Sequence, residues 1–268
     1  MPDAYPSQQL WDSKADLMRY DMVLLSCEGQ DTVDGPSGAA VSLSDSDRQN
    51  LLDYANGGGK VFASHFHYAW FNQGPFANAT NPPMATWLTG SQTVDDGRSF
   101  PGVVVTKLPN GKAFPQGIAM QDWLANVGAL QNGKLPIYYT RHNVSALNSP
   151  PAQAWITLDP SSPVPNTTQY FSIDAPFTGG AMTGENACGR VVYSDLHVSG
   201  GPGMMEPGLN VAPDYPGAAA VGGGGGTVPS GCAPRKLTPQ EAALEFMIFN
   251  LSSCVVPPDR DGGPPPIN

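Results

Sequence analysis

Apolar runs that end in polar residues recur along this chain, and each predicts a buried strand. They are YDMVLLSCEG (residues 20–29), KVFASHFH (60–67) and GRVVYSDLH (189–197). Runs with few polar interruptions are typical of strands that are covered on both faces of a parallel sheet. We therefore expect these three strands to lie in a mostly parallel sheet.

Three further segments predict helices: residues 44–56, 119–130 and 237–251. Ser44 is followed three residues later by Asp47, which resembles a capping box, and a glycine run follows the segment. The last segment has Thr238 as N-cap, followed by Pro239 and Glu241. Since the first helix connects the first two strands through short turns, we expect a right-handed βαβ unit with parallel strands.

The remaining strands are less regular. Residues 102–108 and 135–140 predict short strands, and residues 152–159 and 168–177 predict an antiparallel pair. The resulting fold prediction is one α/β domain over residues 1–254: a three-layer, mostly parallel sheet with long loops over the carboxyl rim of its strands. Residues 255–268 (VVPPDRDGGPPPIN) predict a disordered tail rich in proline and glycine.

The net charge of the chain limits the classes of partner that it is expected to bind. The 268 residues carry a formal net charge of −10, which repels phosphate backbones, so we expect no nucleic-acid partner. Without a basic groove, a small neutral substrate is favoured over a polyanionic one. No run of about 18 apolar residues occurs, so no membrane span is expected.

The four cysteines are Cys27, Cys188, Cys232 and Cys254, and none forms a CxxC pair, which excludes a zinc ribbon. Cys232 and Cys254 flank the last predicted helix and are candidates for a disulfide, with Cys188 as a competitor for either. One disulfide predicts an extracytoplasmic protein, and the alternative is four reduced thiols in a cytosolic protein. The first residues lack a basic start and an apolar core, so we expect that an export signal is absent from this chain.

Polar and titratable residues follow each of the three buried runs. They are Cys27 and Glu28 after the first, His65 and His67 at the end of the second, and Asp195 and His197 after the third. In an open parallel sheet, ligands bind at the carboxyl ends of the strands. If these strands are neighbours, the six side chains converge on one rim.

Such a cluster suits zinc, which binds nitrogen, sulfur and oxygen ligands and activates a water molecule. His65 and His67 are expected on the same side of an extended strand, about 6–7 Å apart. The predicted ligands are His65, His67 and His197, with Cys27 or Asp195 as a further ligand and Glu28 as general base. This set predicts hydrolysis of carboxylic or phosphoric esters.

Two alternatives remain open. Without a metal, Cys27 is a candidate nucleophile, with His65 or His197 as its base and Glu28 or Asp195 orienting that base. The other alternative is a non-catalytic module of a larger secreted protein, which binds carbohydrate or a partner.

The segments YDMVLLSCEG, LLDYANGGGKVFASHFH and CGRVVYSDLH resemble the ThuA-like branch of the class I glutamine-amidotransferase-like superfamily. The blocks SCEG, SHFHY and QEAALEFM also resemble a group of uncharacterised secreted bacterial proteins. The resemblance covers residues 17–67 and 187–254. It implies a flavodoxin-like sheet with helices on both faces, and a first βα unit that this chain is expected to lack. The Gly-x-Cys-x-Gly motif of the amidotransferases has no counterpart here, so the resemblance does not imply glutaminase activity.

Overall fold

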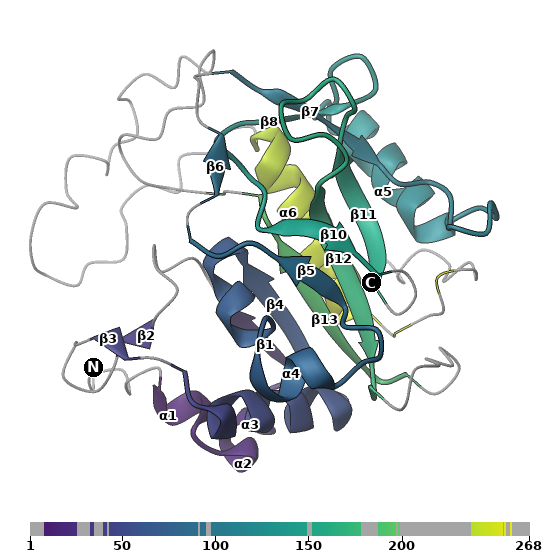
Figure 1. The fold of residues 1–268 in the computed structure, drawn as a ribbon. Helices are drawn as coiled ribbons and strands as arrows, with labels where there is room; N and C mark the ends of the chain where they lie inside the picture. The colour runs from purple at the N-terminus through teal and green to yellow at the C-terminus, as the bar shows by residue number, and fades with distance from the viewer. Residues whose placement is uncertain are drawn as a thin grey trace, which may run out of the picture.

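The computed structural model describes residues 8–25, 33–34, 40–41, 43–90, 92–94, 98–148, 152–177, 187–196, 198, 237–253, 255 and 258. These residues form a seven-stranded sheet with helices against both faces (Figure 1). In spatial order its strands are β1 (Met22–Leu25), β4 (Lys60–Ser64), β13 (Gly189–Ser194), β12 (Thr168–Ala175), β11 (Gln153–Leu158), β7 (Phe100–Val104) and β8 (Leu135–Ile137).

Shorter elements complete the described part of the chain. The helices are α1 (Gln8–Trp11), α2 (Lys14–Leu17), α3 (Asp45–Asn56), α4 (Gly74–Asn78), α5 (Pro115–Asn126), α6 (Pro239–Ser252) and the 3-10 helix η1 (His65–Trp70). Two-stranded ribbons pair β2 (Val33–Asp34) with β3 (Ala40–Val41), β5 (Ala85–Trp87) with β10 (Val144–Leu147), and β6 (Thr93–Val94) with β9 (Thr140–Arg141). Within these described segments no helix is both long and apolar enough to cross a membrane.

The sheet is mixed, so the prediction of a mostly parallel, flavodoxin-like sheet is wrong. β1 and β4 are parallel neighbours, as the βαβ unit predicts, and β13 lies parallel to β4 on its other side. From β13 onward every pairing, through β12, β11 and β7 to β8, is antiparallel. A parallel neighbour requires a crossover of a dozen or more residues, whereas β11 and β12 are joined by the short loop 159–167 and pair as a hairpin.

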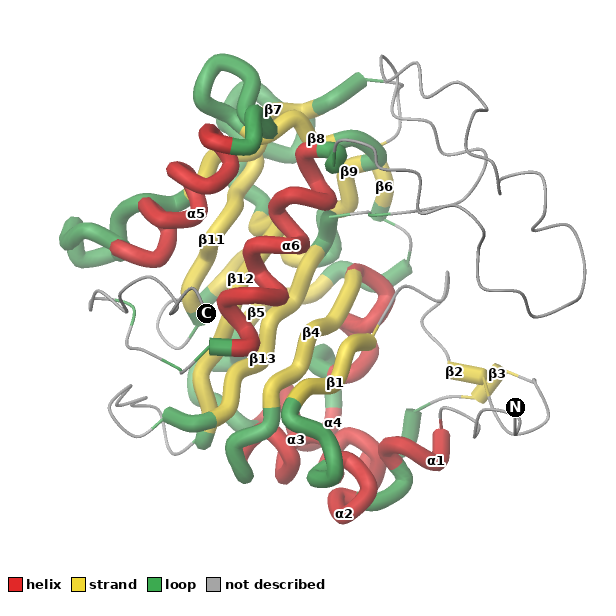
Figure 2. The backbone as a smooth tube through the Cα atoms, turned by 180° about the vertical axis from the view of Figure 1, so that it is seen from behind, coloured by secondary structure: helices red, strands yellow, loops and turns green. Residues whose placement is uncertain are grey.

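Burial explains why the apolar runs suggested parallel strands. All eight positions of β12 and all six of β13 are buried. α5 and α6 cover one face of the sheet, as Figure 2 shows for α6, while α3, η1 and the β5–β10 ribbon pack against the other. Because both faces are covered, antiparallel strands carry the continuous hydrophobic pattern that is usually typical of parallel ones.

The two long helices that begin at predicted caps are confirmed. The hydroxyl of Ser44 accepts a hydrogen bond from the backbone N–H of Asp47 at 3.1 Å, and the Asp47 carboxylate accepts one from the Ser44 N–H at 2.9 Å. Thr238 and Glu241 form the same reciprocal pair at the start of α6. Helix α5 begins at Pro115, four residues before the predicted start, because a proline at the first position needs no donor partner.

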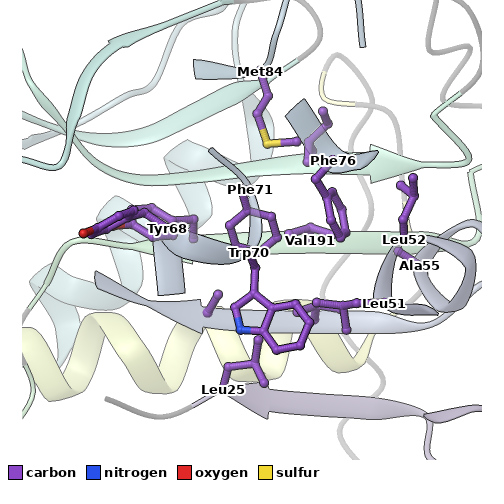
Figure 3. Packing of buried hydrophobic residues seen from close by; sticks show 14 of the residues in the cluster. Leu25, Leu51, Leu52, Ala55, Tyr68, Trp70, Phe71, Phe76, Met84 and Val191 are labelled. Carbon is purple, nitrogen blue, oxygen red and sulfur yellow. The ribbon is translucent and has the colours of Figure 1, made fainter. Parts of the chain in front are cut away.

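The aromatic residues after β4 belong to the core on the α3 side. Figure 3 shows Tyr68, Trp70 and Phe71 among the side chains between the sheet and the helices. The Trp70 ring meets the Trp11 ring edge-on, with their centroids 5.3 Å apart. This packing holds η1 against the core directly after β4 ends.

Candidate functional site

The predicted rim depends on three strands, and these lie side by side. β1 pairs with β4 and β4 with β13, all parallel, and Ser64 lies opposite Ser194 at the last register position. The residues that follow β4 and β13 therefore begin at the same edge of the sheet. Of the six predicted site residues, His65, His67 and Asp195 are described. Cys27, Glu28 and His197 lie outside the described residues and stay predictions.

The two histidines do not extend the strand. β4 ends at Ser64, and His65 begins η1, which also contains His67. In a 3-10 helix, with three residues per turn, side chains two positions apart point in directions about 120° apart. The expectation that both imidazoles lie on the same side of an extended strand is therefore wrong. Both residues are buried.

The environment of His67 keeps its imidazole neutral. Burial lowers the pKa of His67 from 6.5 to about 4, although hydrogen bonding with the Ser64 backbone opposes the shift. The Nδ1 atom of His67 lies 3.1 Å from the Ser64 Oγ. Since this contact engages Nδ1, Nε2 is the nitrogen through which His67 would bind a ligand. A hydrogen bond at one ring nitrogen is the usual way in which proteins orient a ligating histidine.

Asp195 is a fully buried carboxyl group at the start of the segment after β13. Its Oδ2 accepts a hydrogen bond from the backbone N–H of Val144 at 3.2 Å, and its Oδ1 lies 2.8 Å from the Tyr193 hydroxyl. Burial raises the pKa of Asp195 to about 7, against the opposing effects of these hydrogen bonds and of the Arg141 charge. The carboxyl group is therefore partly protonated at neutral pH.

The hydrogen bonds of the Tyr193 hydroxyl are compatible with a protonated Asp195. It donates to the backbone carbonyl of His65 at 2.6 Å. A phenol has one proton, and a carbonyl oxygen accepts only, so a protonated Asp195 donates to the Tyr193 oxygen while Tyr193 donates to His65. The chain of hydrogen bonds from Asp195 through Tyr193 to His65 connects the end of β13 to the start of η1.

A segment that the sequence analysis did not assign to the site lies against the same edge. Asp195 binds the N–H of Val144, and the Asn143 side chain donates to the carbonyls of Leu88 and Gly90. The Arg141 guanidinium carbon lies 5.4 Å from the centroid of the Phe66 ring, which belongs to η1. Residues 141–144 thus border the rim, although their pattern between two short strands gave no sign of it. His142, in this segment, is the remaining histidine of the chain.

The described part of the predicted cluster does not by itself form a metal site. Among the described residues, no three His, Cys, Asp or Glu side chains are grouped so that they could hold a metal ion. Asp195 binds a backbone amide and the Tyr193 hydroxyl, an arrangement that suits a positioning role better than ligation. A zinc site therefore depends on Cys27 and His197 as ligands, and its general base would be Glu28. The predicted disulfide likewise depends on cysteines outside the described residues.

No family model matches this chain, and no curated protein matches it. The resemblance to the ThuA-like branch therefore stays a prediction. Six chains of solved structures match, among them one described as "Cytoplasmic Protein STM3548 from Salmonella typhimurium". It is 12% identical, with a TM-score of 0.42, and the match covers 76% of this chain and 69% of that chain. A likeness this distant carries no argument about fold or function.

Proposed function

We propose that this protein is a hydrolase of carboxylic or phosphoric esters, with its site at the rim where β1, β4 and β13 end. The observation that carries the proposal is the adjacency of these three parallel strands. The three strands end at neighbouring points of the sheet. In the sequence, Cys27 and Glu28 come after β1, the two histidines after β4, and His197 after β13. Ligands bind at this end of parallel strands.

The proposed ligands are a histidine of η1 together with His197 and Cys27, and Glu28 is the proposed general base. A zinc ion held by this set would activate a water molecule for attack on the ester. His67 suits ligation because its imidazole is neutral and its Nδ1 is engaged by Ser64. A small neutral ester remains the expected substrate, and an extracytoplasmic location remains the expected setting.

A second candidate uses no metal. Cys27 follows β1 by two residues, and β1 is paired with the strand that leads into His65. A thiol beside an imidazole is the arrangement of a cysteine nucleophile. His67 suits the role of general base poorly, because a base works best with a pKa near the working pH and burial lowers that of His67 to about 4. This candidate therefore needs His65 or His197 as base.

The test is elemental analysis of the purified protein combined with hydrolysis of two probes, p-nitrophenyl acetate and bis(p-nitrophenyl) phosphate. The proposal expects about one zinc per chain, because three protein ligands and a water molecule make up a single four-coordinate site. It also expects loss of activity on chelation and recovery with added zinc. The variants are His67→Gln and the double change His65→Ala with His67→Ala, and Tyr20→Phe, at an exposed position that precedes β1, is the control.

The alternatives predict different results. A cysteine enzyme would hydrolyse the probes without metal, resist the chelator and lose activity on alkylation of Cys27. A binding module would hydrolyse neither probe under any of these treatments. Absence of zinc from the native protein, even after incubation with zinc, would overturn the metal mechanism.

A further inference from the structure

We infer that Arg48 of α3 is a positioning residue, which fixes η1 and thereby places the histidines at the rim. The inference rests on the proposed function in so far as those histidines serve it. Arg48 lies on the helix between β1 and β4, and η1 follows β4. A residue of the βαβ unit thus holds η1, the segment that immediately follows the unit in the chain.

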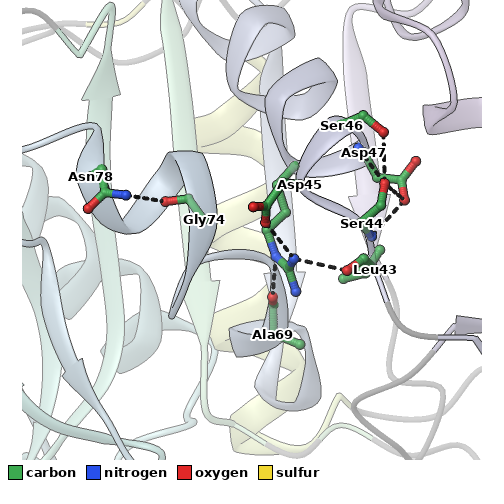
Figure 4. Close-up of polar contacts among 9 residues, drawn as sticks. Leu43, Ser44, Asp45, Ser46, Asp47, Ala69, Gly74 and Asn78 are labelled. Atoms are coloured by element: carbon green, nitrogen blue, oxygen red, sulfur yellow. Dashed lines mark hydrogen bonds and ion pairs between the residues drawn. The ribbon is translucent and has the colours of Figure 1, made fainter.

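The contacts of Arg48 join two separate segments to α3. Its Nε donates to the carbonyl oxygen of Ala69 at 3.0 Å, and its Nη1 donates to the carbonyl oxygen of Leu43 at 2.9 Å, as Figure 4 shows. Ala69 is the fifth residue of η1. The carbonyl groups near the end of a helix lack partners within it and attract a cation. Arg48 supplies both the donor and the charge.

Arg48 is buried, which is costly for a guanidinium group and calls for a reason. Its nearest carboxylate partner, Asp45, lies 3.3 Å away, but the Asp45 side chain is 77% exposed, so water screens this pair. The two backbone carbonyls are the contacts that satisfy the buried group. A well-packed apolar residue often stabilises a fold at least as well as a buried charge. The arginine contributes instead a directional link between α3 and η1.

This link and the Tyr193 bond hold opposite ends of η1. Tyr193 donates to the carbonyl of His65, the first residue of η1, and Arg48 donates to that of Ala69. His67 lies between the two points. α3 also holds α1, whose Trp11 packs on Trp70: the Asn50 amide donates to the carbonyls of Trp11 and Asp12. α3 thus supports η1 directly through Arg48 and indirectly, through Asn50 and α1.

The absence of a side chain at Gly74 leaves room for Arg48 and Asp45. Gly74, with φ of +62°, lies so close that a Cβ atom there would be 2.5 Å from Asp45 Oδ1 and 3.1 Å from Arg48 Cδ. A side chain at this position would also be strained by its backbone conformation. Gly74→Ala is therefore a second way to displace Arg48 while leaving its donors in place.

The test compares Arg48→Met, which keeps an apolar stem but has no donors, with Arg48→Lys, which keeps the charge but not the planar fork. Asp45→Asn removes the exposed ion pair only, and Ile137→Val, in the other core cluster, serves as a control for general loss of stability. The readouts are amide hydrogen exchange in residues 65–72, the NMR titration of the His67 imidazole, and the affinity for zinc alone.

Arg48→Met is expected to speed exchange in residues 65–72 at least tenfold more than in α5, and to raise the pKa of His67 toward 6.5 as its burial is lost. Zinc affinity should fall about 10–100-fold, the range seen when groups that orient ligands are removed. Arg48→Lys and Gly74→Ala should show smaller changes of the same kind, and Asp45→Asn and Ile137→Val none beyond their effect on stability.

The outcomes separate the two proposals. If exchange in residues 65–72 and the His67 titration change no more in Arg48→Met than in Ile137→Val, the positioning role is wrong. If Arg48→Met does not fold, Arg48→Lys and Gly74→Ala decide by the same comparison. If the native protein binds no zinc, the metal mechanism fails, while exchange and the imidazole titration still decide the role of Arg48.

Discussion

The hydroxyl of Tyr193 lies 2.6 Å from the backbone carbonyl oxygen of His65 and joins the end of β13 to the start of η1. The hydroxyl oxygen of Tyr193 also lies 2.8 Å from Asp195 Oδ1. The Tyr193 ring packs edge-on against Trp87, with their centroids 4.9 Å apart. The aromatic core therefore fixes the direction in which the hydroxyl points, and the hydroxyl fixes the peptide that introduces the two histidines.

Tyr193→Phe keeps this ring packing and removes the hydroxyl. The carbonyl of His65 and the carboxyl of Asp195 then lose a partner inside the core, which costs about 1–3 kcal/mol when buried groups are left unsatisfied. Guanidinium unfolding should therefore show a lower midpoint. Tyr20→Phe is the matched control, because the Tyr20 side chain is 54% exposed. Equal losses in the two variants would contradict a role for the Tyr193 hydrogen bond.

Asp195 and His67 should make opposite contributions to the pH dependence of stability. Burial raises the pKa of Asp195 from 3.8 to about 7, so between these values the folded protein holds a proton that the unfolded chain has lost. Its contribution to stability falls as pH rises through this window. Burial lowers the pKa of His67 from 6.5 to about 4, so here the unfolded chain holds the extra proton, and stability rises with pH.

Asp195→Asn should reveal the contribution of His67. The amide donates to the Tyr193 oxygen and accepts from the Val144 N–H, so it mimics the protonated acid. Between pH 4 and 6.5 the free energy of unfolding of the variant should rise relative to the native protein, by up to about 1.4 kcal/mol per pH unit. Denaturant unfolding at several pH values measures this slope. His67→Gln should change the slope in the opposite direction, and an unchanged slope in Asp195→Asn would contradict the raised pKa.

The sequence predicted those features that depend on neighbouring residues. The caps of α3 and α6 were found because Ser44 and Asp47, or Thr238 and Glu241, are three residues apart. The parallel pairing of β1 with β4 followed from the βαβ unit, whereas the place of β13 beside β4 was a condition of the predicted rim that the sequence could not supply. The sequence also predicts the antiparallel pair β11–β12, and this pair places the strands from β12 to β8 in the antiparallel part of the sheet.

Features that depend on distant contacts were missed. Apolar residues stand on both sides of the junction, at 61–63 and at 68–71, and the polar residues between them suit the end of a strand as well as the start of a 3-10 helix, so the pattern does not mark where β4 becomes η1. That turn is set by packing against Trp11 and by Arg48. Tyr193 binds a residue 128 positions away, and such a partner leaves no local trace in the sequence.

Replacing only one partner of the buried ion pair between Arg190 and Asp174 is expected to lower the free energy of unfolding strongly. Arg190 Nε and Nη2 lie 2.6 and 3.1 Å from the two Asp174 oxygens, and Nη1 donates to Asn250 of α6. Asp174→Ala leaves an unpaired buried charge and should cost about 3–5 kcal/mol, whereas Asp174→Leu combined with Arg190→Met should cost less. Unfolding of the two singles and the double gives the coupling energy.

A matched control for this pair is Arg19, which forms an exposed ion pair with Asp16. Arg19→Ala should change stability by less than about 1 kcal/mol. A double variant that loses as much as the sum of its two single changes would show that Arg190 and Asp174 do not act as a pair.

Gly189→Ala tests how closely α3 must approach the sheet. A Cβ atom at this position of β13 would lie 2.0 Å from the carbonyl oxygen of Ala55 and 2.9 Å from that of Gly59. Both are backbone atoms, so α3 itself must move, and we expect a loss of about 3 kcal/mol or more. Gly57→Ala is the milder control, because its nearest contact would be 3.2 Å. Since α3 carries Arg48, its displacement should also speed hydrogen exchange in η1. Similar losses in both variants, without faster exchange in residues 65–70, would show that the α3–β13 contact does not set the position of η1.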